Sequence, residues 1–191
     1  MKKLIKSKNI SLKTEDELKF LRKRVKELEI QVIADSLTGI YNNKHFKERL
    51  VQEIEKSKRY KKSLCLAMMD LDDFKKCNDS FGHLEGDCLI VEISRTLKKV
   101  SRCVDIVCRY AGDEFAVILP EITLEQAKTY AQKIRMEISS LQLKCSPSIS
   151  IGIAQSNKTS DMKELIQNAD KALYHAKNNG KNKISDSIDV F

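Results

Sequence analysis

The sequence DIVCRYAGDEFAVIL, residues 105–119, decides the fold. Its two β-rich runs, Asp105–Tyr110 and Phe115–Leu119, flank the segment Ala111-Gly112-Asp113-Glu114. Two such runs joined by a short glycine-containing segment are typical of a β-hairpin. The sequence therefore predicts two antiparallel strands, with an acidic pair at the tip of the hairpin.

Other strands and helices are expected on both sides of this hairpin. The run Ser63–Met69 is short and continuously apolar, as in a central strand. Ser148–Ala154 indicates a further strand, and Lys183–Ser185 a last edge strand. Helical periodicity predicts helices at 43–60, within Phe81–Val100, at Thr123–Leu141 with Thr123 as N-cap, and at Ser160–Asn178. This order predicts an α+β fold with a split βαβ, ferredoxin-like sheet that contains antiparallel pairs and has its flanking helices on one face.

The N-terminal segment has a different pattern. Apolar residues step by three and four along Leu18, Leu21, Val25, Leu28 and Val32, and residues 12–34 contain neither Gly nor Pro. This is a coiled-coil a/d seam, so we expect residues 1–34 to form a dimerisation helix ahead of a domain at 35–191. The alternative is an amphipathic helix that packs its narrow stripe on its own domain.

The composition is that of a globular protein, with 41% hydrophobic and 32% charged residues. No apolar run approaches the length of a membrane span, and no apolar segment follows the basic start, so a cytoplasmic protein without a signal peptide is expected. Residues 1–62 contain 18 Lys and Arg against 9 Asp and Glu, and account for the whole net charge of +8. A solvated helix face is favoured over contact with lipid, and no nucleic-acid partner is expected.

The chain has six cysteines, at positions 65, 77, 88, 103, 108 and 145. None forms a Cys-x-x-Cys pair, and most lie within apolar runs. Buried free thiols are therefore predicted in preference to disulfides or a zinc site.

The acidic residues gather at strand ends. Asp70 directly follows the apolar run Ser63–Met69, Asp72 lies two residues later, and Asp113 and Glu114 are at the hairpin tip. In a split βαβ sheet these positions meet at one edge. Clustered carboxylates select hard cations such as Mg²⁺ or Mn²⁺, and two such ions are the usual device for phosphoryl transfer. Solvated acidic turns are the alternative.

Nearby polar residues suit a nucleotide. Lys75 is placed to contact phosphate, and Asn78 and Asp87 offer the amide and carboxylate that a guanine edge needs. Lys177 and Lys181 flank Gly180 and form a basic arm for phosphates. Each lysine taken alone is more often simply part of the solvated surface.

The segment Arg109–Phe115, RYAGDEF, resembles the signature of the GGDEF family of diguanylate cyclases. Five further blocks resemble the family in order and spacing: DSLTGIYN at 35–42, DLDDFKKCND at 70–79, FGHLEGD at 81–87, SISIG at 148–152, and ADKALY with AKNNGKN between 169 and 182. The resemblance covers about residues 35–185. It implies a nucleotide-cyclase and polymerase-palm-like sheet, and an enzyme that condenses two GTP into cyclic di-GMP.

The resemblance also implies roles for individual residues. Asp70, the carbonyl of Leu71, Asp113 and Glu114 would hold two Mg²⁺ or Mn²⁺ ions per site. Asp113 would act as base for the 3′-hydroxyl. Lys75 would stabilise the transition-state phosphate. The implied GTP-binding residues are Phe74, Asn78, His83, Asp87, Lys177 and Lys181. For His83, a buried structural histidine is an equal alternative.

Each domain of this family would hold one GTP, so the resemblance implies a homodimer, here through residues 12–34. Arg102 and Asp105 match the family's inhibitory motif, where cyclic di-GMP would bind as a product inhibitor. Ala111 replaces the first signature glycine, Asn43 replaces an arginine, and Lys181 replaces another. None of these departures removes a catalytic group. The alternative function is a catalytically silent module that binds GTP or cyclic di-GMP.

Overall fold

The computed structural model describes residues 17–21, 24 and 32–189. The chain separates into two units, residues 1–34 and 35–191. Of the predicted seam, Leu18, Leu21 and Val32 are described and have exposed side chains, while Val25 and Leu28 lie outside the described residues. The coiled-coil dimer through 12–34 therefore stays a prediction.

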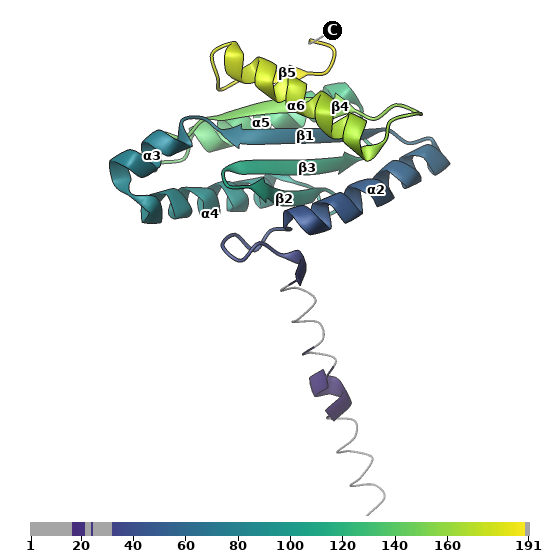
Figure 1. Cartoon of the computed structure of the whole chain (residues 1–191), viewed down its shortest axis with the longest axis horizontal. Helices are drawn as coiled ribbons and strands as arrows, with labels where there is room; N and C mark the ends of the chain where they lie inside the picture. The colour runs from purple at the N-terminus through teal and green to yellow at the C-terminus, as the bar shows by residue number, and fades with distance from the viewer. Residues whose placement is uncertain (1–16, 22–23, 25–31, 190–191) are drawn as a thin grey trace, which may run out of the picture. The chain divides into compact units, whose positions relative to one another are not determined.

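The larger unit is built on a five-stranded sheet in the order β2-β3-β1-β4-β5 (Figure 1). Strand β1 (Leu64–Leu71) pairs antiparallel with β3 (Glu114–Pro120) and with β4 (Ile149–Gln155). The predicted hairpin is confirmed, because β2 (Ile106–Ala111) pairs antiparallel with β3. The predicted edge strand is β5 (Ile184–Asp186), which pairs parallel with β4. All eight residues of β1 are buried, as expected of a central strand.

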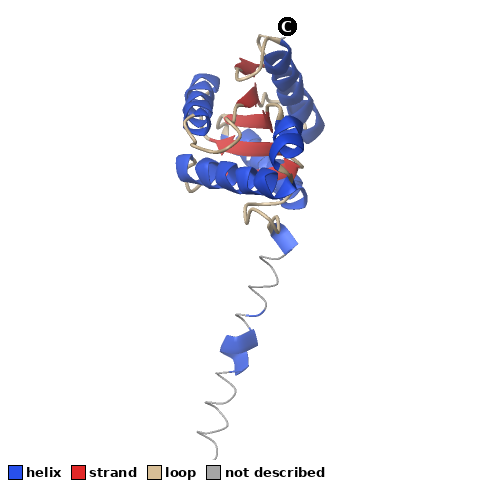
Figure 2. Cartoon of the chain, turned by 90° about the vertical axis from the view of Figure 1, so that its left-hand side faces the viewer, coloured by secondary structure: helices blue, strands red, loops and turns tan. Residues whose placement is uncertain are grey.

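Helices cover both faces of this sheet, so the prediction of helices on one face is wrong (Figure 2). Helices α2 (Asn43–Tyr60) and α6 (Met162–Asn178) pack on one face; α4 (His83–Val100) and α5 (Leu124–Ser139) pack on the other. Alternate residues of β1 enter two separate cores: Leu64, Leu66 and Met68 on the α2 and α6 face, and Cys65, Ala67 and Met69 on the other. A strand that is apolar at successive positions needs cover on both faces.

The predicted helices form at nearly the expected positions, and one further helix forms. Thr123 caps α5 in a capping box with Gln126, which confirms the predicted N-cap. The helix not expected is α3 (Phe74–Phe81), which has only eight residues and no side-chain hydrogen bond from its N-cap Asp73. A helix so short gives little periodic signal in the sequence.

Close backbone contact fixes α6 against β4. A Cβ placed on Gly152 of β4 would overlap the backbone of Ala169 and Leu173 in α6. Glycine therefore allows α6 to lie directly on the strand. This contact sets the position of the C-terminal part of α6, which includes Lys177.

The cysteines differ from the prediction of buried free thiols. Cys77 of α3 and Cys145 form a disulfide across a sequence separation of 68, with Cα atoms 5.7 Å apart. Cys65 and Cys108 are buried and free as expected, whereas Cys88 and Cys103 are free but exposed. The prediction failed for Cys77 and Cys145 because sequence spacing says nothing about partners that only the tertiary fold brings together.

Candidate active site

Two of the predicted acidic residues lie directly opposite each other in the sheet. Asp70 of β1 pairs with Glu114 of β3 in the antiparallel register. The backbone N–H of Leu71 donates to the carbonyl oxygen of Asp113, 3.3 Å away, which ties the hairpin tip to the end of β1. Sheet register therefore brings Asp70, Asp113 and Glu114 to one edge of the sheet.

Three carboxylates lie close together at this edge, and the ammonium of Lys177 offsets only part of their negative charge. Burial raises the pKa of the Asp70 carboxyl, and the charges of Asp113 and Asp72 raise it further. Burial and the charge of Asp70 likewise raise the pKa of Glu114. The Nζ of Lys177 lies 2.7 Å from the Oδ2 of Asp70 and offsets part of this charge. Carboxylates whose ionised forms repel each other in this way bind a cation favourably.

Asp72 has a different role from the acids beside it. Its carboxylate accepts hydrogen bonds from the Ser148 hydroxyl at 2.8 Å, the Ser150 hydroxyl at 2.7 Å and the Asn182 backbone N–H at 2.8 Å. These bonds join the end of β1 to the start of β4 and to the segment before β5. Sequence reasoning grouped Asp72 with the other acids at this edge, but its oxygens are already engaged by the protein.

The donor set fits a hard divalent cation. No three His, Cys, Asp or Glu side chains form a ready-made metal-binding group within residues 17–21, 24 and 32–189. Asp70, Asp113 and Glu114 nevertheless supply only carboxylate oxygens, which Mg²⁺ and Mn²⁺ prefer. The ammonium of Lys177 contacts the Oδ2 of Asp70, so it would compete with an ion for that oxygen.

The predicted guanine-binding residues meet at the corner between α3 and α4. Gly86 of α4 faces both Phe74 and Asn78, and a Cβ at this glycine would collide with the Asn78 amide. The Oδ1 of Asn78 is buried and accepts no hydrogen bond from the protein. Asp87 is the next residue on α4 and is exposed. His83 is exposed too, so the alternative of a buried structural histidine is wrong.

The predicted phosphate-binding lysines lie at two acids rather than free in solvent. Lys177 contacts Asp70, as described above, and the Nζ of Lys181 lies 2.9 Å from the Oδ1 of Asp73. Lys75, on the first turn of α3, is exposed. Lys177, near the C-terminal end of α6, therefore contacts the end of β1, and Lys181, in the turn after α6, contacts the turn between β1 and α3.

A salt bridge that sequence reasoning did not foresee anchors the hairpin. The Nη1 of Arg109 lies 3.2 Å from the Oδ1 of Asp35, and its Nε donates to the Gly112 carbonyl at 2.8 Å. The same Asp35 carboxylate accepts from the backbone and hydroxyl of Thr38. Asn43, the residue noted above as an arginine replacement, donates from Nδ2 to the Tyr110 carbonyl at 2.8 Å. The DSLTG block thus holds the signature hairpin.

The two residues of the predicted inhibitory site bind each other. The Nη2 of Arg102 lies 2.6 Å from the Oδ1 of Asp105 and 2.9 Å from the carbonyl oxygen of Pro120. They line a cavity of about 580 Å³ with other polar residues, among them Arg49 and Lys56. None of Asp70, Asp113 and Glu114 lines this cavity, so the two sites are separate.

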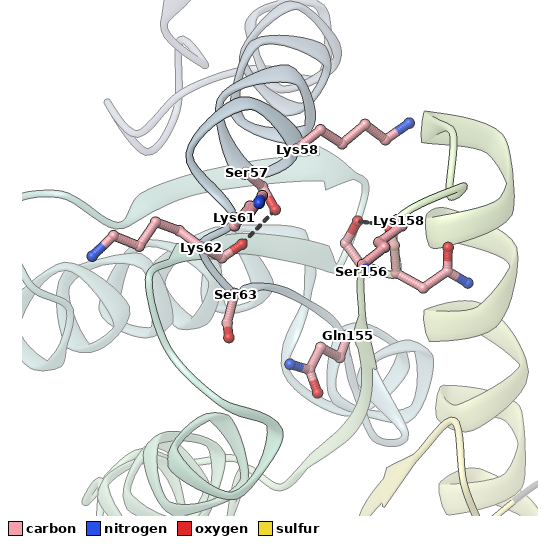
Figure 3. Close-up of a pocket in the computed structure, with 9 residues that line it drawn as sticks. Ser57, Lys58, Lys61, Lys62, Ser63, Gln155, Ser156 and Lys158 are labelled. Carbon is pink, nitrogen blue, oxygen red and sulfur yellow. Dashed lines mark hydrogen bonds between the residues drawn. The ribbon is translucent and has the colours of Figure 1, made fainter.

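A cavity of about 600 Å³ lies at the start of β1, at the end of the strand opposite to Asp70 (Figure 3). It contains four lysines, Lys58, Lys61, Lys62 and Lys158, and none of the predicted site residues. Three of these lysines lie at the carboxyl end of α2, where cations stabilise the helix dipole. That effect accounts for their presence without a ligand.

The sheet order and the acidic hairpin beside β1 define a palm-like fold of the nucleotide-cyclase class. Residues 32–183 match the sequence model of the family described as diguanylate cyclase, GGDEF domain. The chain belongs to this family.

Relatives support the same grouping. The chain is 34% identical over 168 residues to the probable diguanylate cyclase DgcC of Escherichia coli, covering 85% of this chain and 45% of that protein. It is 33% identical over 175 residues to the diguanylate cyclase DgcP of Pseudomonas aeruginosa, covering 89% and 26%. The chain thus spans less than half the length of these two relatives.

Solved structures agree. The coiled coil and GGDEF domain of DgcB from Caulobacter crescentus, in complex with c-di-GMP, matches with a TM-score of 0.85 at 28% identity, over 91% of this chain and 95% of that one. Diguanylate cyclase SiaD of Pseudomonas aeruginosa, in complex with its activator SiaC, matches with a TM-score of 0.81 at 30% identity, over 97% and 73%. In the part of the chain that the structure describes, no helix is both long and apolar enough to cross a membrane.

Proposed function

We propose that this chain is a diguanylate cyclase that condenses two GTP molecules into cyclic di-GMP and two pyrophosphates. The observation that supports this best is the pairing of Asp70 with Glu114, with Asp113 beside them at the hairpin tip. An inactive relative would be expected to lack one of these acids, and all three are present.

Asp70, the Leu71 carbonyl, Asp113 and Glu114 would hold two divalent ions, Mg²⁺ or Mn²⁺. Such ions, when bound, activate the attacking oxygen and offset the charge of the triphosphate. Asp113 would take the proton from the 3′-hydroxyl of one GTP as its oxygen attacks the α-phosphate of the other. Burial, and after it the charges of neighbouring acids, raise the pKa values of Asp70 and Glu114, and a bound cation would stabilise both ionised carboxylates.

GTP would be bound at the α3–α4 corner. The unpartnered Oδ1 of Asn78 and the carboxylate of Asp87 would accept hydrogen bonds from the guanine N1–H and N2–H₂ groups, and Phe74 and His83 would border the base. Lys75 would stabilise the charge that develops on the reacting phosphate. Lys177 and Lys181 would exchange their contacts with Asp70 and Asp73 for phosphate oxygens.

Catalysis would need two domains with their GTP molecules face to face. A homodimer through residues 12–34 would raise the effective concentration of the second site. The availability of GTP as substrate favours a cytoplasmic reaction. Cyclic di-GMP would inhibit at Arg102 and Asp105; to bind there, it would have to replace part of the contact between these two side chains.

The direct test is incubation of the purified chain with GTP and Mg²⁺, followed by chromatography of the products. Cyclic di-GMP formation is the expected result. Tight binding of GTP or cyclic di-GMP without any turnover would instead favour the silent binding module.

A further inference from the structure

The Cys77–Cys145 disulfide lies next to the residues that we assign to GTP. Cys77 is buried in α3, directly before Asn78 and two residues after Lys75. Cys145 lies in the irregular segment 140–148 between α5 and β4. The disulfide therefore connects α3, the proposed nucleotide-binding helix, to a segment that lies 68 residues further along the chain.

Helix α3 depends on such tertiary anchors. Eight residues form a helix that is marginal by itself, because the cost of starting a helix is spread over few hydrogen bonds. Its N-cap residue Asp73 adopts a left-handed conformation and makes no capping hydrogen bond. The position of α3 is therefore set by packing against α4 and by the bond from Cys77.

Segment 140–148 also contacts α4, next to α3, through an ion pair. The Nζ of Lys144 lies 2.9 Å from the Glu85 carboxylate on the first turn of α4. That ion pair is exposed, so it stabilises the contact only weakly. Cys145 is half-buried, and its neighbours Lys144 and Ser146 are exposed, so a reductant in solution can approach the disulfide from the Cys145 side.

We propose that the Cys77–Cys145 disulfide is a redox-controlled positioning device that holds α3, and with it Lys75 and Asn78, in the GTP-binding arrangement. A dithiol reductant would supply two electrons and two protons: the S–S bond breaks, Cys77 and Cys145 become thiols, and the two thiols of the reductant join in a disulfide. A disulfide oxidant reverses the step. Disulfides in the cytoplasm are usually of this transient, redox-sensing kind.

The test compares the full chain in oxidised and reduced dithiothreitol. Alkylation after denaturation should count four thiols in the oxidised protein and six in the reduced protein. Amide hydrogen exchange across residues 75–81 should be faster by at least about tenfold in the reduced protein, since the helix loses an anchor. Because this part needs no substrate, it decides the inference even if the proposed cyclase activity is absent.

The kinetic part rests on the proposed function. Reduction should raise the KM for GTP by at least about threefold and change kcat less, because the anchor acts on the binding residues of the free enzyme. Cys145→Ser should have the raised KM of the reduced wild type under both oxidising and reducing conditions, so its KM should not respond to the reductant. Cys88→Ser, which removes an exposed thiol on α4, should respond as the wild type does.

Two results would overturn the inference. One is a count of six thiols in the protein after oxidation, which would mean that the bond does not form. The other is equal amide exchange in α3 in the oxidised and reduced proteins, which would mean that the bond forms without positioning the helix.

Discussion

The ammonium of Lys177 lies 2.7 Å from the carboxylate of Asp70, so a cation from the last turn of α6 already lies at the acidic edge of the sheet. This contact explains how three neighbouring acids are tolerated there. It also places a phosphate-binding candidate beside the proposed ion site, where the lysine can move from carboxylate to phosphate as ion and GTP arrive.

Asp70 and Asp72 provide a matched pair of mutations. Asp70→Asn should abolish turnover but leave the free energy of unfolding unchanged or higher, because a buried carboxylate that neighbouring acids repel is removed. Asp72→Asn should lower the free energy of unfolding by about 1–3 kcal/mol, because two serine hydroxyls and a backbone N–H lose a charged acceptor. Denaturant unfolding and product assays of both variants check this contrast. Near-normal synthesis by Asp70→Asn would refute the assignment.

The Asp35–Arg109 pair should give a specific pH dependence. Burial opposes ionisation of Asp35, but hydrogen bonds from Thr38 and the charge of Arg109 outweigh it and lower the pKa below the ordinary 3.8. A lowered folded-state pKa contributes stability above pH 3.8, which is lost as the pH falls through the folded value. Asp35→Asn should therefore cost about 1–2 kcal/mol at pH 7 and progressively less as the pH falls below 3.8.

The measurement for this pair is urea unfolding of wild type and variant across that pH range. Ser36→Ala is the control, since Ser36 is the exposed neighbour in the same turn. An equal loss of stability at pH 7 and pH 3 would show that the charge of Asp35 is not what matters.

Two glycine substitutions separate steric overlap from backbone strain. Gly152→Ala should lower the free energy of unfolding by about 2–3 kcal/mol or more, because the new methyl group overlaps the α6 backbone. Gly39→Ala meets no atom within 4 Å and should cost only about 1 kcal/mol, for its positive φ of 66°. Gly152→Ala should also reduce activity, because α6 positions Lys177. Equal thermal stabilities of the two variants would contradict the close packing of α6 on β4.

Selection of guanine should depend on the α3–α4 corner. GTP should be preferred over ATP by orders of magnitude, because adenine would leave the acceptors of Asn78 and Asp87 without donors. Gly86→Ala should weaken GTP binding much as Asn78→Ala does, since its methyl group displaces the Asn78 amide. Calorimetric titration with a non-hydrolysable GTP analogue measures both variants. Unchanged affinity for the GTP analogue in Gly86→Ala would mean that Asn78 does not bind the guanine base.

Arg102→Ala tests the proposed product site. The concentration of cyclic di-GMP that inhibits should rise at least tenfold, about 1.4 kcal/mol, while the initial rate changes little. Half-exposed Arg102 also bonds the buried Asp105, so a small loss of thermal stability should accompany the change. Inhibition that GTP fully outcompetes, or an unaltered inhibition curve, would mean that the Arg102–Asp105 pair only stabilises the turn before β2.

Much of the fold follows from local pattern. The apolar run at the start of β1 and the hairpin around Gly112 were evident because strand pairing and burial act on neighbouring residues. The same run also indicates helices on both faces of the sheet, because a strand that is apolar at successive positions is buried on both sides. Helix α3 was missed because eight residues held by tertiary contacts have no period of their own.

The candidate site was less accessible to sequence reasoning. Motif positions indicated Asp70, Asp113 and Glu114, and sheet register brings them together. The bonds of Asp72 to two serines, the Arg109–Asp35 bridge and the Cys77–Cys145 bond each join residues 68 or more positions apart. Such pairings are fixed by the folded geometry and leave no local pattern.

Synthesis of cyclic di-GMP by the purified full chain, with and without a chelator, tests the central claim most directly. With GTP and excess Mg²⁺ the chain should form cyclic di-GMP and two pyrophosphates per product, and both the chelator and Asp70→Asn should stop the reaction. A folded wild-type protein that binds GTP but forms no cyclic di-GMP with Mg²⁺ or Mn²⁺ would contradict it.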